Sequence, residues 1–586
     1  MSKSRQEIHV APVEQLREQG VIVVRGAHHT IGVFADGEQV YAVDNRCPHM
    51  GFPLDRGTVS NGILTCHWHQ ARFDLGSGCT FDLWADDVLK FRTRIDNGEV
   101  YVETTPMNER TEAWYRHRLV QGIEQAVDLV QAKSLLAITS NEDGDPKVLL
   151  RDIVEFAAAN LDRMSEGLIR LGCVANLYPR LNRDTAYQGL LYATRQIANE
   201  ATMAVPHRSR DPLAGPRYDE ARLKSWLRQW VQTRHRDGVE RTLLTGLGLP
   251  EQELADLVFS VACERLYANG GHLFEDCNKV FELTMHLGEG SARKLFPLLV
   301  DGLAGARGQE ESTNWHHPVE IVRPLAQLDE ELPGIMANND GRGSPAPDLI
   351  PVILGDDPIA IIATLKNALE QRVNPLPLAR EVAYAAALRL ARFATSNEVT
   401  DWFNPQHTFI HANAVYQAVK RSPTPEVIRA IFQGAMSVYQ DRFLNVPPAR
   451  LPSEKNISTD LPADRTTLLS LLLDQLNQRG DIDHAANVVA RYIGLGHDFD
   501  ALVDTIALGT LREDLDFHSL QVLDAAANQC DAWNDNRVIE NIMVGVIRNL
   551  AAHCPTRRAG EQTARIAAKL QRGERIFEEA NGQPAA

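Results

Sequence analysis

Four residues near the N-terminus have the types and the spacing of a metal site. One residue separates Cys47 from His49, two separate Cys66 from His69, and sixteen lie between the two pairs. Thiolates and neutral imidazoles are the side chains that bind zinc, iron and iron–sulfur clusters. The four residues are therefore predicted to share one metal centre.

The alternation of Cys and His within each pair distinguishes a cluster from a zinc site. Zinc fingers place Cys beside Cys and His beside His, whereas each pair here holds one of each. In a Rieske [2Fe–2S] centre, two thiolates bind one iron and two imidazoles bind the other. We predict that Cys47 and Cys66 hold the first iron and that His49 and His69 hold the second. Neutral imidazoles raise the reduction potential above that of an all-Cys cluster.

Residues 1–105 resemble a Rieske ferredoxin domain, which implies two cluster-binding loops at the tip of a β-fold. The positions that carry the resemblance surround the two ligand pairs: Pro48, Gly51, Leu54, Gly57, Trp68, Phe73, Asp74 and Gly78.

The chain departs from the family pattern in two places. The usual Cys-Pro-x-His-Gly is Cys66-His67-Trp68-His69-Gln70 here, so His67 is an alternative ligand, although its spacing favours His69. Phe52 and Trp68 occupy the places of the cysteines that form a disulfide in respiratory-complex Rieske proteins. The second departure indicates the ferredoxin or oxygenase branch of the family, whose potential is lower.

The elements that must position these residues change character along the chain. Short runs rich in Val, Ile and aromatics, with turn signals at Asp36-Gly37 and Asn97-Gly98, predict a small antiparallel β-fold. From about residue 112, apolar residues recur at helical spacing instead. We predict a multidomain protein: an all-β Rieske domain at 1–105, a linker at 106–117 and an all-α helical-repeat domain at 118–580. Residues 206–216 and 324–358 are predicted to be long loops.

Three helical segments look related, and each contains a histidine. The segments at His272 and His407 share His, Phe, Asn, Val and an aromatic in register, and the segment at His518 follows a similar upstream helix. Such repetition is typical of stacked helix pairs. We expect each histidine to open a helix and the three repeats to bring them to one cavity. A histidine that only caps a helix or packs in a core is the alternative for each position.

The repeats supply the candidate catalytic residues His272, His407 and His518. At helical spacing, His272 shares a face with Glu275 and Asp276, and His407 shares one with His411. His and carboxylate ligands on helices suit a non-haem metal, above all iron. The candidate ligands of this second metal are His272, Asp276, His407 and His411, and His286 and Trp315-His316-His317 are further candidates.

The two halves together favour an oxidoreductase. The Asp/Glu-x-x-His-x₃₋₄-His motif of ring-hydroxylating Rieske oxygenases is missing from the sequence. The helical part faintly resembles questin-oxidase-like proteins, which implies oxidative ring opening of a quinone. We expect an oxygenase whose cluster passes electrons to a His-lined metal or substrate site. The alternative is a non-catalytic electron carrier or redox sensor whose helices form a scaffold or docking domain.

Composition restricts the partners. A net charge of −17 argues against nucleic acid and anionic membranes, and no apolar stretch is long enough to span a bilayer. No leader sequence is visible, so a cytoplasmic location is expected, with the six scattered cysteines reduced. The sequence has no dinucleotide-binding fingerprint, which predicts a separate reductase as electron donor. A small organic substrate and a homo-oligomer are further expectations.

Overall fold

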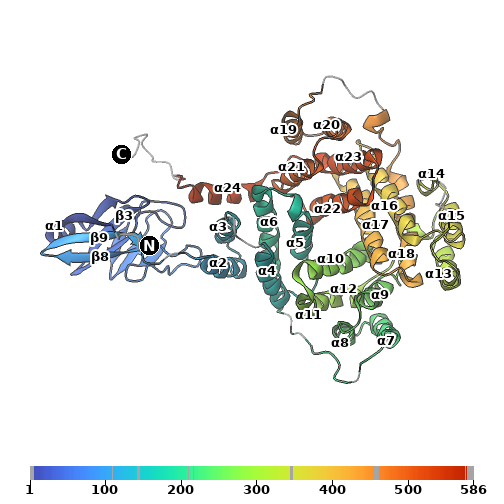
Figure 1. Ribbon diagram of the computed structural model, residues 1–586, viewed down its shortest axis with the longest axis horizontal. Coiled ribbons are helices and arrows are strands. Elements are labelled where there is room, and N and C mark those ends of the chain that lie inside the picture. The colour runs from blue at the N-terminus through green and yellow to red at the C-terminus, as the bar shows by residue number, and fades with distance from the viewer. Residues whose placement is uncertain are drawn as a thin grey trace. The chain divides into compact units, whose positions relative to one another are not determined.

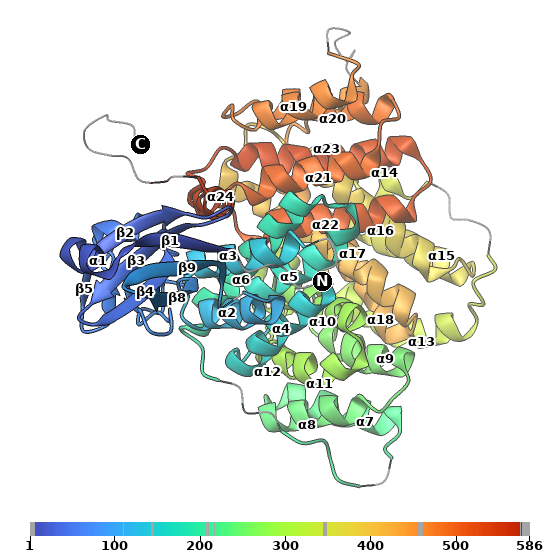
Figure 2. The ribbon, with the colours of Figure 1, turned by 60° about the vertical axis from the view of Figure 1, so that its left-hand side comes forward.

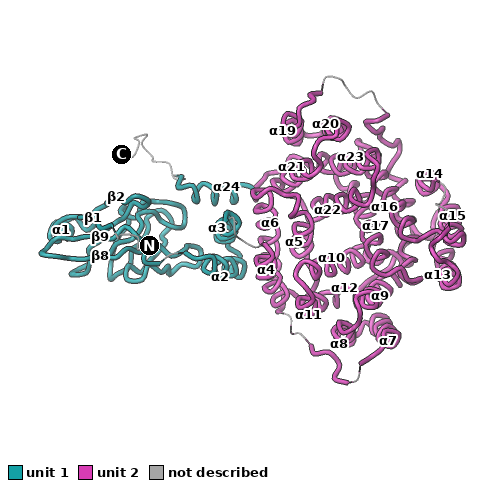
Figure 3. Tube along the Cα trace, in the orientation of Figure 1, with its two compact units in different colours: residues 1–145, 561–586 teal, residues 146–560 magenta. Residues whose placement is uncertain are grey.

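The structure is a computed structural model that describes residues 6–574 and 576, apart from 109, 142–145, 207, 209, 216, 344–347 and 455–460. It divides into two compact units, shown in Figure 3. Unit 1 consists of residues 1–145 together with 561–586, and unit 2 of residues 146–560. Unit 2 is therefore a continuous segment inserted into the sequence of unit 1.

Among its described residues, unit 1 has nine strands in two antiparallel sheets, and Figure 1 shows this β-fold. The larger sheet has the order β1-β9-β8-β4-β3-β2, and the smaller one the order β5-β6-β7. The strands are β1 (Glu7–Pro12), β2 (Val21–Arg25), β3 (Thr30–Asp36), β4 (Gln39–Asp44), β5 (Thr58–Ser60), β6 (Ile63–Thr65), β7 (Arg72–Asp74), β8 (Lys90–Asp96) and β9 (Glu99–Pro106), with helix α1 (Val13–Gln19) after β1.

The two predicted hairpin turns are confirmed, and both use residues that tolerate a positive φ. Asp36 pairs with Gln39 across the β3–β4 turn, where Gly37 has φ +61°. Asp96 pairs with Glu99 across the β8–β9 turn, where Asn97 and Gly98 have φ +50° and +81°. Two-residue turns with positive φ match the twist of the paired strands, so these turns set the strand register.

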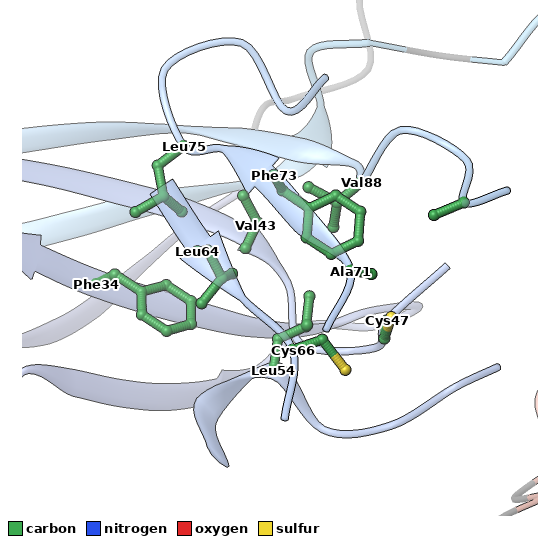
Figure 4. Packing of buried hydrophobic residues seen from close by; sticks show 11 residues of the cluster. Phe34, Val43, Cys47, Leu54, Leu64, Cys66, Ala71, Phe73, Leu75 and Val88 are labelled. Atoms are coloured by element: carbon green, nitrogen blue, oxygen red, sulfur yellow. The ribbon is translucent and has the colours of Figure 1, made fainter. Parts of the chain in front are cut away.

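A hydrophobic core lies between the sheets and ends at the two cysteines of the motif. Phe34, Val43, Leu64 and Phe73 are wholly or almost wholly buried in it. Figure 4 shows the sulfurs of Cys47 and Cys66 at one end of this core, on neighbouring loops. The loop with Cys47 follows β4, and the loop with Cys66 joins β6 to β7. Strand pairing therefore brings together cysteines that are 19 residues apart in sequence.

Three helices complete unit 1: α2 (Glu112–Glu124), α3 (Asp128–Thr139) and most of α24 (Ala559–Gln571). The predicted linker at 106–117 differs from the structure, because α2 begins within it. The domain boundaries expected at 105 and 118 also differ from the compact units. The reason is that α2 and α3 belong to unit 1, where Arg118 of α2 donates to the carbonyls of Leu83 and Ala85 in the loop between β7 and β8.

Unit 2 is helical, and among the described residues no strand follows Pro106, as predicted. Its helices are α4 (Pro146–Asn160), α5 (Glu166–Leu177), α6 (Arg183–Ala201), α7 (Glu220–Gln232), α8 (Arg236–Gly246), α9 (Glu251–Ala262), α10 (His272–Leu287), α11 (Ala292–Leu295), α12 (Val300–Gly305), α13 (Val322–Ala337), α14 (Ile350–Ile353), α15 (Pro358–Glu370), α16 (Pro375–Ala391), α17 (Phe403–Arg421), α18 (Pro425–Gln440), α19 (Arg465–Gln475), α20 (Ile482–Gly494), α21 (Phe499–Leu511), α22 (Phe517–Ala532) and α23 (Asn536–His553). Within the described part of the chain, no helix combines the length and the apolar character needed to cross a bilayer.

Helices α10, α17 and α22 form the centre of unit 2. Figures 1 and 2 place them between the α7–α8 pair and the α19–α20 pair. Buried residues occur on most faces of these three helices, and they include polar as well as apolar side chains. A helix that is buried on nearly all sides belongs to the core of a large domain.

The prediction of a long loop at 324–358 is wrong. Helix α13 covers residues 322–337 and contains Pro333, and the short α14 covers 350–353. A proline inside a helix removes one backbone hydrogen bond, which burial of Leu325, Leu328 and Leu332 on the inner face of α13 offsets. The stretch 206–216 has no helix or strand among its described residues, as expected.

Two glycines of unit 1 provide a matched test of backbone crowding. Gly78 has φ +83°, and a Cβ there would lie 2.6 Å from the Val88 carbonyl oxygen, whereas a Cβ on Gly37 meets nothing within 4 Å. We expect Gly78→Ala to lower the free energy of unfolding by about 3 kcal/mol and Gly37→Ala by about 1 kcal/mol. Urea unfolding followed by tryptophan fluorescence measures both. Equal losses in the two variants would contradict the crowding argument.

Candidate metal centres

Two loops of the same shape carry the four residues of the Cys/His motif. In each loop the cysteine N–H donates to the carbonyl five residues later, Cys47 to Phe52 and Cys66 to Ala71, at 2.8 Å in both cases. The residue four positions after each cysteine has a positive φ, Gly51 at +82° and Gln70 at +64°. Gln70 therefore takes up the turn in which the family pattern has glycine.

The cysteines are buried and their sulfurs are in contact. Cys47 is 2% and Cys66 1% exposed, and their side chains form a hydrogen bond. Backbone amides of His49 and Met50 point to the Cys47 sulfur, and those of Trp68 and His69 to the Cys66 sulfur. The contact with Cys47 lowers the pKa of Cys66 to about 6, while the contact and burial raise the pKa of Cys47.

The two histidines lie together beside the cysteines. The ring centroids of His49 and His69 are 4.8 Å apart, and Trp84 packs 4.6 Å from His49. Burial lowers the pKa of His49 to about 4 and also lowers that of His69. His49 Nδ1 is buried without a hydrogen-bond partner in the described structure. Both rings are therefore neutral and can offer a lone pair to a metal.

The departures from the family pattern have structural counterparts. Phe52 and Trp68, which occupy the places of the disulfide of respiratory-complex Rieske proteins, pack against each other across the two loops with ring centroids 6.0 Å apart. All eight cysteines of the chain are free thiols. His67 is exposed, and its Nε2 lies 3.3 Å from the Thr58 hydroxyl. The alternative ligand thus lies against a strand, whereas His69 lies beside His49.

A buried ion network supports the first loop. Lys133 Nζ donates to the Pro48 carbonyl at 2.9 Å and pairs with Asp86, which also accepts from Arg118 Nε at 2.9 Å. Burial works to raise the pKa of Asp86, but Lys133, Arg110 and Arg118 together outweigh it, and the pKa falls to about 2. Lys133 lies on α3 and Arg118 on α2, so helices outside the β-fold hold the loop in place.

Unit 2 brings together the three predicted catalytic histidines. One ring nitrogen from each of His272, His407 and His518 lies within 4.8 Å of the others, and the ring centroids are 4.3 to 5.2 Å apart. His272 is the first residue of α10, and His518 is the second residue of α22. His407 does not open its helix as expected, because α17 begins one turn earlier, at Phe403, with Pro405 in its first turn.

Carboxylates contact two of these histidines. Glu275 Oε2 lies 3.3 Å from His272 Nδ1, and Asp516 Oδ1 lies 3.4 Å from His518 Nδ1. A carboxylate on one ring nitrogen orients the imidazole and leaves Nε2 for a metal. The carboxylate that pairs with His272 is thus Glu275, the neighbour of the predicted ligand Asp276.

The protonation of the site reflects its burial. Glu275 is 2% exposed, and within the described structure neither of its carboxylate oxygens is within hydrogen-bonding geometry of a donor, although one lies near His272. Burial opposes a charge on His272, but Glu275 outweighs it and raises the pKa of His272 to about 9. Burial lowers the pKa of His407 to about 3. His407 Nε2 is also buried without a hydrogen bond, so its lone pair is unused.

The remaining candidates lie apart from this group. His411 is buried one turn after His407, and its ring packs on the Gly271 backbone and on Tyr267. His286 Nε2 lies 2.7 Å from Asn176 Oδ1, at the other end of α10. Both ring nitrogens of His316 are engaged, with Glu320 and with the Glu310 carbonyl.

The comparisons with known proteins identify the N-terminal domain. Residues 6–88 match the Rieske [2Fe-2S] domain. The chain is 30% identical over 78 residues to ferredoxin CarAc of Metapseudomonas resinovorans, a match that covers 12% of this chain and 68% of that ferredoxin. The chain belongs to the Rieske [2Fe–2S] family through this N-terminal domain.

Other relatives share only the same domain. Human apoptosis-inducing factor 3 is 35% identical over 71 residues, 12% of each chain. The 4beta-methylsterol monooxygenase of Methylococcus capsulatus is 37% identical over 67 residues, 11% of this chain and 18% of that enzyme. Among solved structures, the ferredoxin of carbazole 1,9a-dioxygenase from Nocardioides aromaticivorans IC177 has 27% identity and a TM-score of 0.16, covering 17% of this chain and 96% of that one. The chain therefore matches under a fifth of the length of several curated relatives.

The residues present fit a [2Fe–2S] cluster. Two buried thiols in mutual contact, two neutral imidazoles and four backbone amides directed at the sulfurs form the donor set of such a centre. The cluster, when bound, supplies one electron at a time. Cys47, Cys66, His49 and His69 are the residues that would hold it, and the two cysteines border an apolar core.

Removal of one thiol tests the ligand assignment. We expect Cys66→Ser to abolish the visible absorption and the acid-labile sulfide of the purified protein, because a serine hydroxyl does not replace the thiolate that binds one iron of the cluster. Cys79→Ser is the matched control, since Cys79 is exposed and lies outside both loops. Retention of the cluster in Cys66→Ser would contradict the assignment.

The ion network predicts a pH-dependent stability. Asp86→Asn leaves Lys133 and Arg118 buried without their carboxylate, which costs about 3–5 kcal/mol of unfolding free energy at pH 7. Because the folded pKa of Asp86 is about 2, below the ordinary 3.8, its contribution is complete above about pH 5 and is lost as the pH falls toward 2. In urea unfolding, the difference in unfolding free energy between wild type and Asp86→Asn should therefore shrink as the pH falls from about 4 to 2. A constant difference would rule out the carboxylate charge as its cause.

Proposed function

We propose that the protein is an iron-dependent oxidoreductase, of the oxygenase type, in which the Rieske cluster supplies electrons to a metal held by His272, His407 and His518 in unit 2. The observation that carries the proposal is the convergence of the three histidines at the centre of the helical unit. They come from three helices more than a hundred residues apart in sequence.

The chemistry of the donor set supports a metal. Three imidazole nitrogens with carboxylates behind two of them suit iron as well as zinc, copper and nickel. Glu275 and Asp516 would orient His272 and His518, and the buried Nε2 of His407 would supply the third lone pair. A metal bound here supplies a site that accepts single electrons. The buried ring of Phe517 packs against His272 and His518 and covers one side of the site.

The proposal includes partners that the chain itself does not contain. A separate reductase would deliver electrons to the cluster, and a small organic molecule would be the substrate. Electron transfer from cluster to helical site would occur within one chain or between the chains of an oligomer, since transfer depends on distance and not on covalent connection.

Metal analysis tests the proposal directly. We expect about three iron atoms per chain in wild-type protein, two of them in the cluster. His407→Ala should reduce this number to about two and leave the visible spectrum of the cluster unchanged, because His407 belongs only to the helical site. His497→Ala is the control, since its ring bonds the Ala463 carbonyl elsewhere in unit 2.

The competing function predicts a different result. If the wild type contains only two irons, both lost in Cys66→Ser, and no other metal, then the helical unit holds no redox metal. The protein would then be an electron carrier or redox sensor with a helical scaffold.

A further inference from the structure

A second buried polar group lies along the same helices as the three-histidine site. On α10, Glu275, Lys279, Glu282 and His286 follow His272 at intervals of three and four residues, so all five share one face. On α22, Asp524 follows His518 by six residues, about 9 Å along the helix. This second group is the lysine cluster, defined as Lys279, Glu282, Asp524 and Asn176.

The lysine cluster is tightly connected. Lys279 Nζ donates to Glu282 at 2.7 Å and pairs with Asp524, and Asn176 Nδ2 donates to Glu282 at 2.8 Å and to Asp524 at 3.1 Å. The side chains of Lys279, Glu282 and Asp524 are only 3%, 5% and 2% exposed. The cluster thus links α5, α10 and α22 through charges that are almost fully removed from water.

The charges in the cluster are unevenly placed. Asp524 and Glu282 share the Lys279 ammonium, whereas the charge of Arg421 on α17 acts on Glu282, both directly and through Asn278. The other groups that face Asp524 are Asn176 and the Cys173 thiol of α5 and Asn528 on its own helix. A buried carboxylate with only a share of one cation is unfavourable when ionised, and uptake of one proton removes its charge. Burial, which outweighs Lys279, raises the pKa of Asp524 to about 6.

The cluster also has a route to solvent. A cavity of about 730 Å³ is bordered by the C-terminal halves of α10, α17 and α22, and Asn176, Glu282 and Asn528 line it. The three histidines lie toward the opposite ends of the same helices. Glu282 therefore belongs both to the cavity wall and to the cluster, and a proton from the cavity reaches Lys279 and Asp524 by way of its carboxylate.

We propose that Asp524 takes up one proton from the cavity when the three-histidine site takes up one electron. The step balances: the reduced Rieske cluster loses one electron, the helical site gains it, and one proton from water moves through Glu282 to a carboxylate oxygen of Asp524. The cause is electrostatic, because a negative charge added at the other end of the same helices makes the buried Asp524 carboxylate less favourable still. Asp524 is a proton-accepting residue and does not touch the metal. This inference rests on the proposed function.

Infrared difference spectroscopy of the full chain tests the inference without a substrate. Purified, iron-loaded protein is reduced in the infrared sample cell, and the reduced-minus-oxidised spectrum is recorded in H₂O and in D₂O. We expect a band of a protonated carboxyl group to appear on reduction and to shift in D₂O. Asp524→Asn should abolish it. Asp531→Asn should retain it, because Asp531 lines the same cavity on α22 but pairs with the exposed side of Arg180.

A second variant keeps the inference testable if Asp524→Asn does not fold. In Lys279→Gln the two carboxylates have no cation, so one is protonated before reduction, and the band should be present in the oxidised state and missing from the difference spectrum. A wild-type spectrum without the band, or a band that persists in Asp524→Asn, would overturn the inference.

The iron content and electron paramagnetic resonance spectrum of the same sample separate the two levels of the proposal. If no redox-active iron is found outside the cluster, the proposed function fails, and this inference fails with it. If such an iron is reduced and no carboxyl band accompanies it, only the inference fails. His407→Ala, which lacks the helical metal in the proposal, should lose the band while its cluster is still reduced.

Discussion

The centre of unit 2 depends on the burial of one carboxylate among three histidine-bearing helices. Glu275 is removed from water and makes no geometric hydrogen bond with the described part of the chain, although it contacts His272. An ionised carboxylate in such a place costs several kcal/mol unless a positive charge is close to it. A proton on His272 or a bound cation satisfies that requirement, and a cation held by all three histidines would also link α10 to α17 and α22. The packing of these helices, the protonation of His272 and the affinity for a metal therefore all depend on the buried Glu275 carboxylate.

Unit 1 satisfies a similar constraint with different means. Asp86 is buried beside the cluster loop, and two cations, Arg118 and Lys133, neutralise it. Both cations come from helices that the β-fold itself does not contain. The loop with Cys47 and His49 thus depends on residues from beyond the Rieske domain proper, because Lys133 also holds the Pro48 carbonyl.

The sequence was sufficient to predict the parts of the structure that local spacing determines. The types and spacing of the ligands identify the cluster motif. The spacing of the apolar residues and the turn residues distinguish the β-fold from the helices. The triad was predicted only through weak repetition. The choice between Glu275 and Asp276 could not be made, because one residue rotates the position on a helix by about 100° and the sequence does not fix which face is inward. The pairing of Lys279 with Asp524 joins residues 245 apart, so no local pattern reveals it. The helical course of α13 through Pro333 was missed because tertiary burial outweighs local propensity.

The chain leaves unit 1 after residue 145 and returns to it at residue 561. The returning helix α24 contributes Ala567, Leu570 and Gln571 to a cavity of about 220 Å³ next to Cys47 and Pro48, and Arg46 donates to the Glu574 carbonyl at 3.0 Å. The helical unit is consequently held by two covalent tethers rather than one, which restricts how far the units separate and raises their effective concentration for each other. A fragment that stops at residue 145 would lack α24, so the redox domain in its native surroundings needs both ends of the polypeptide.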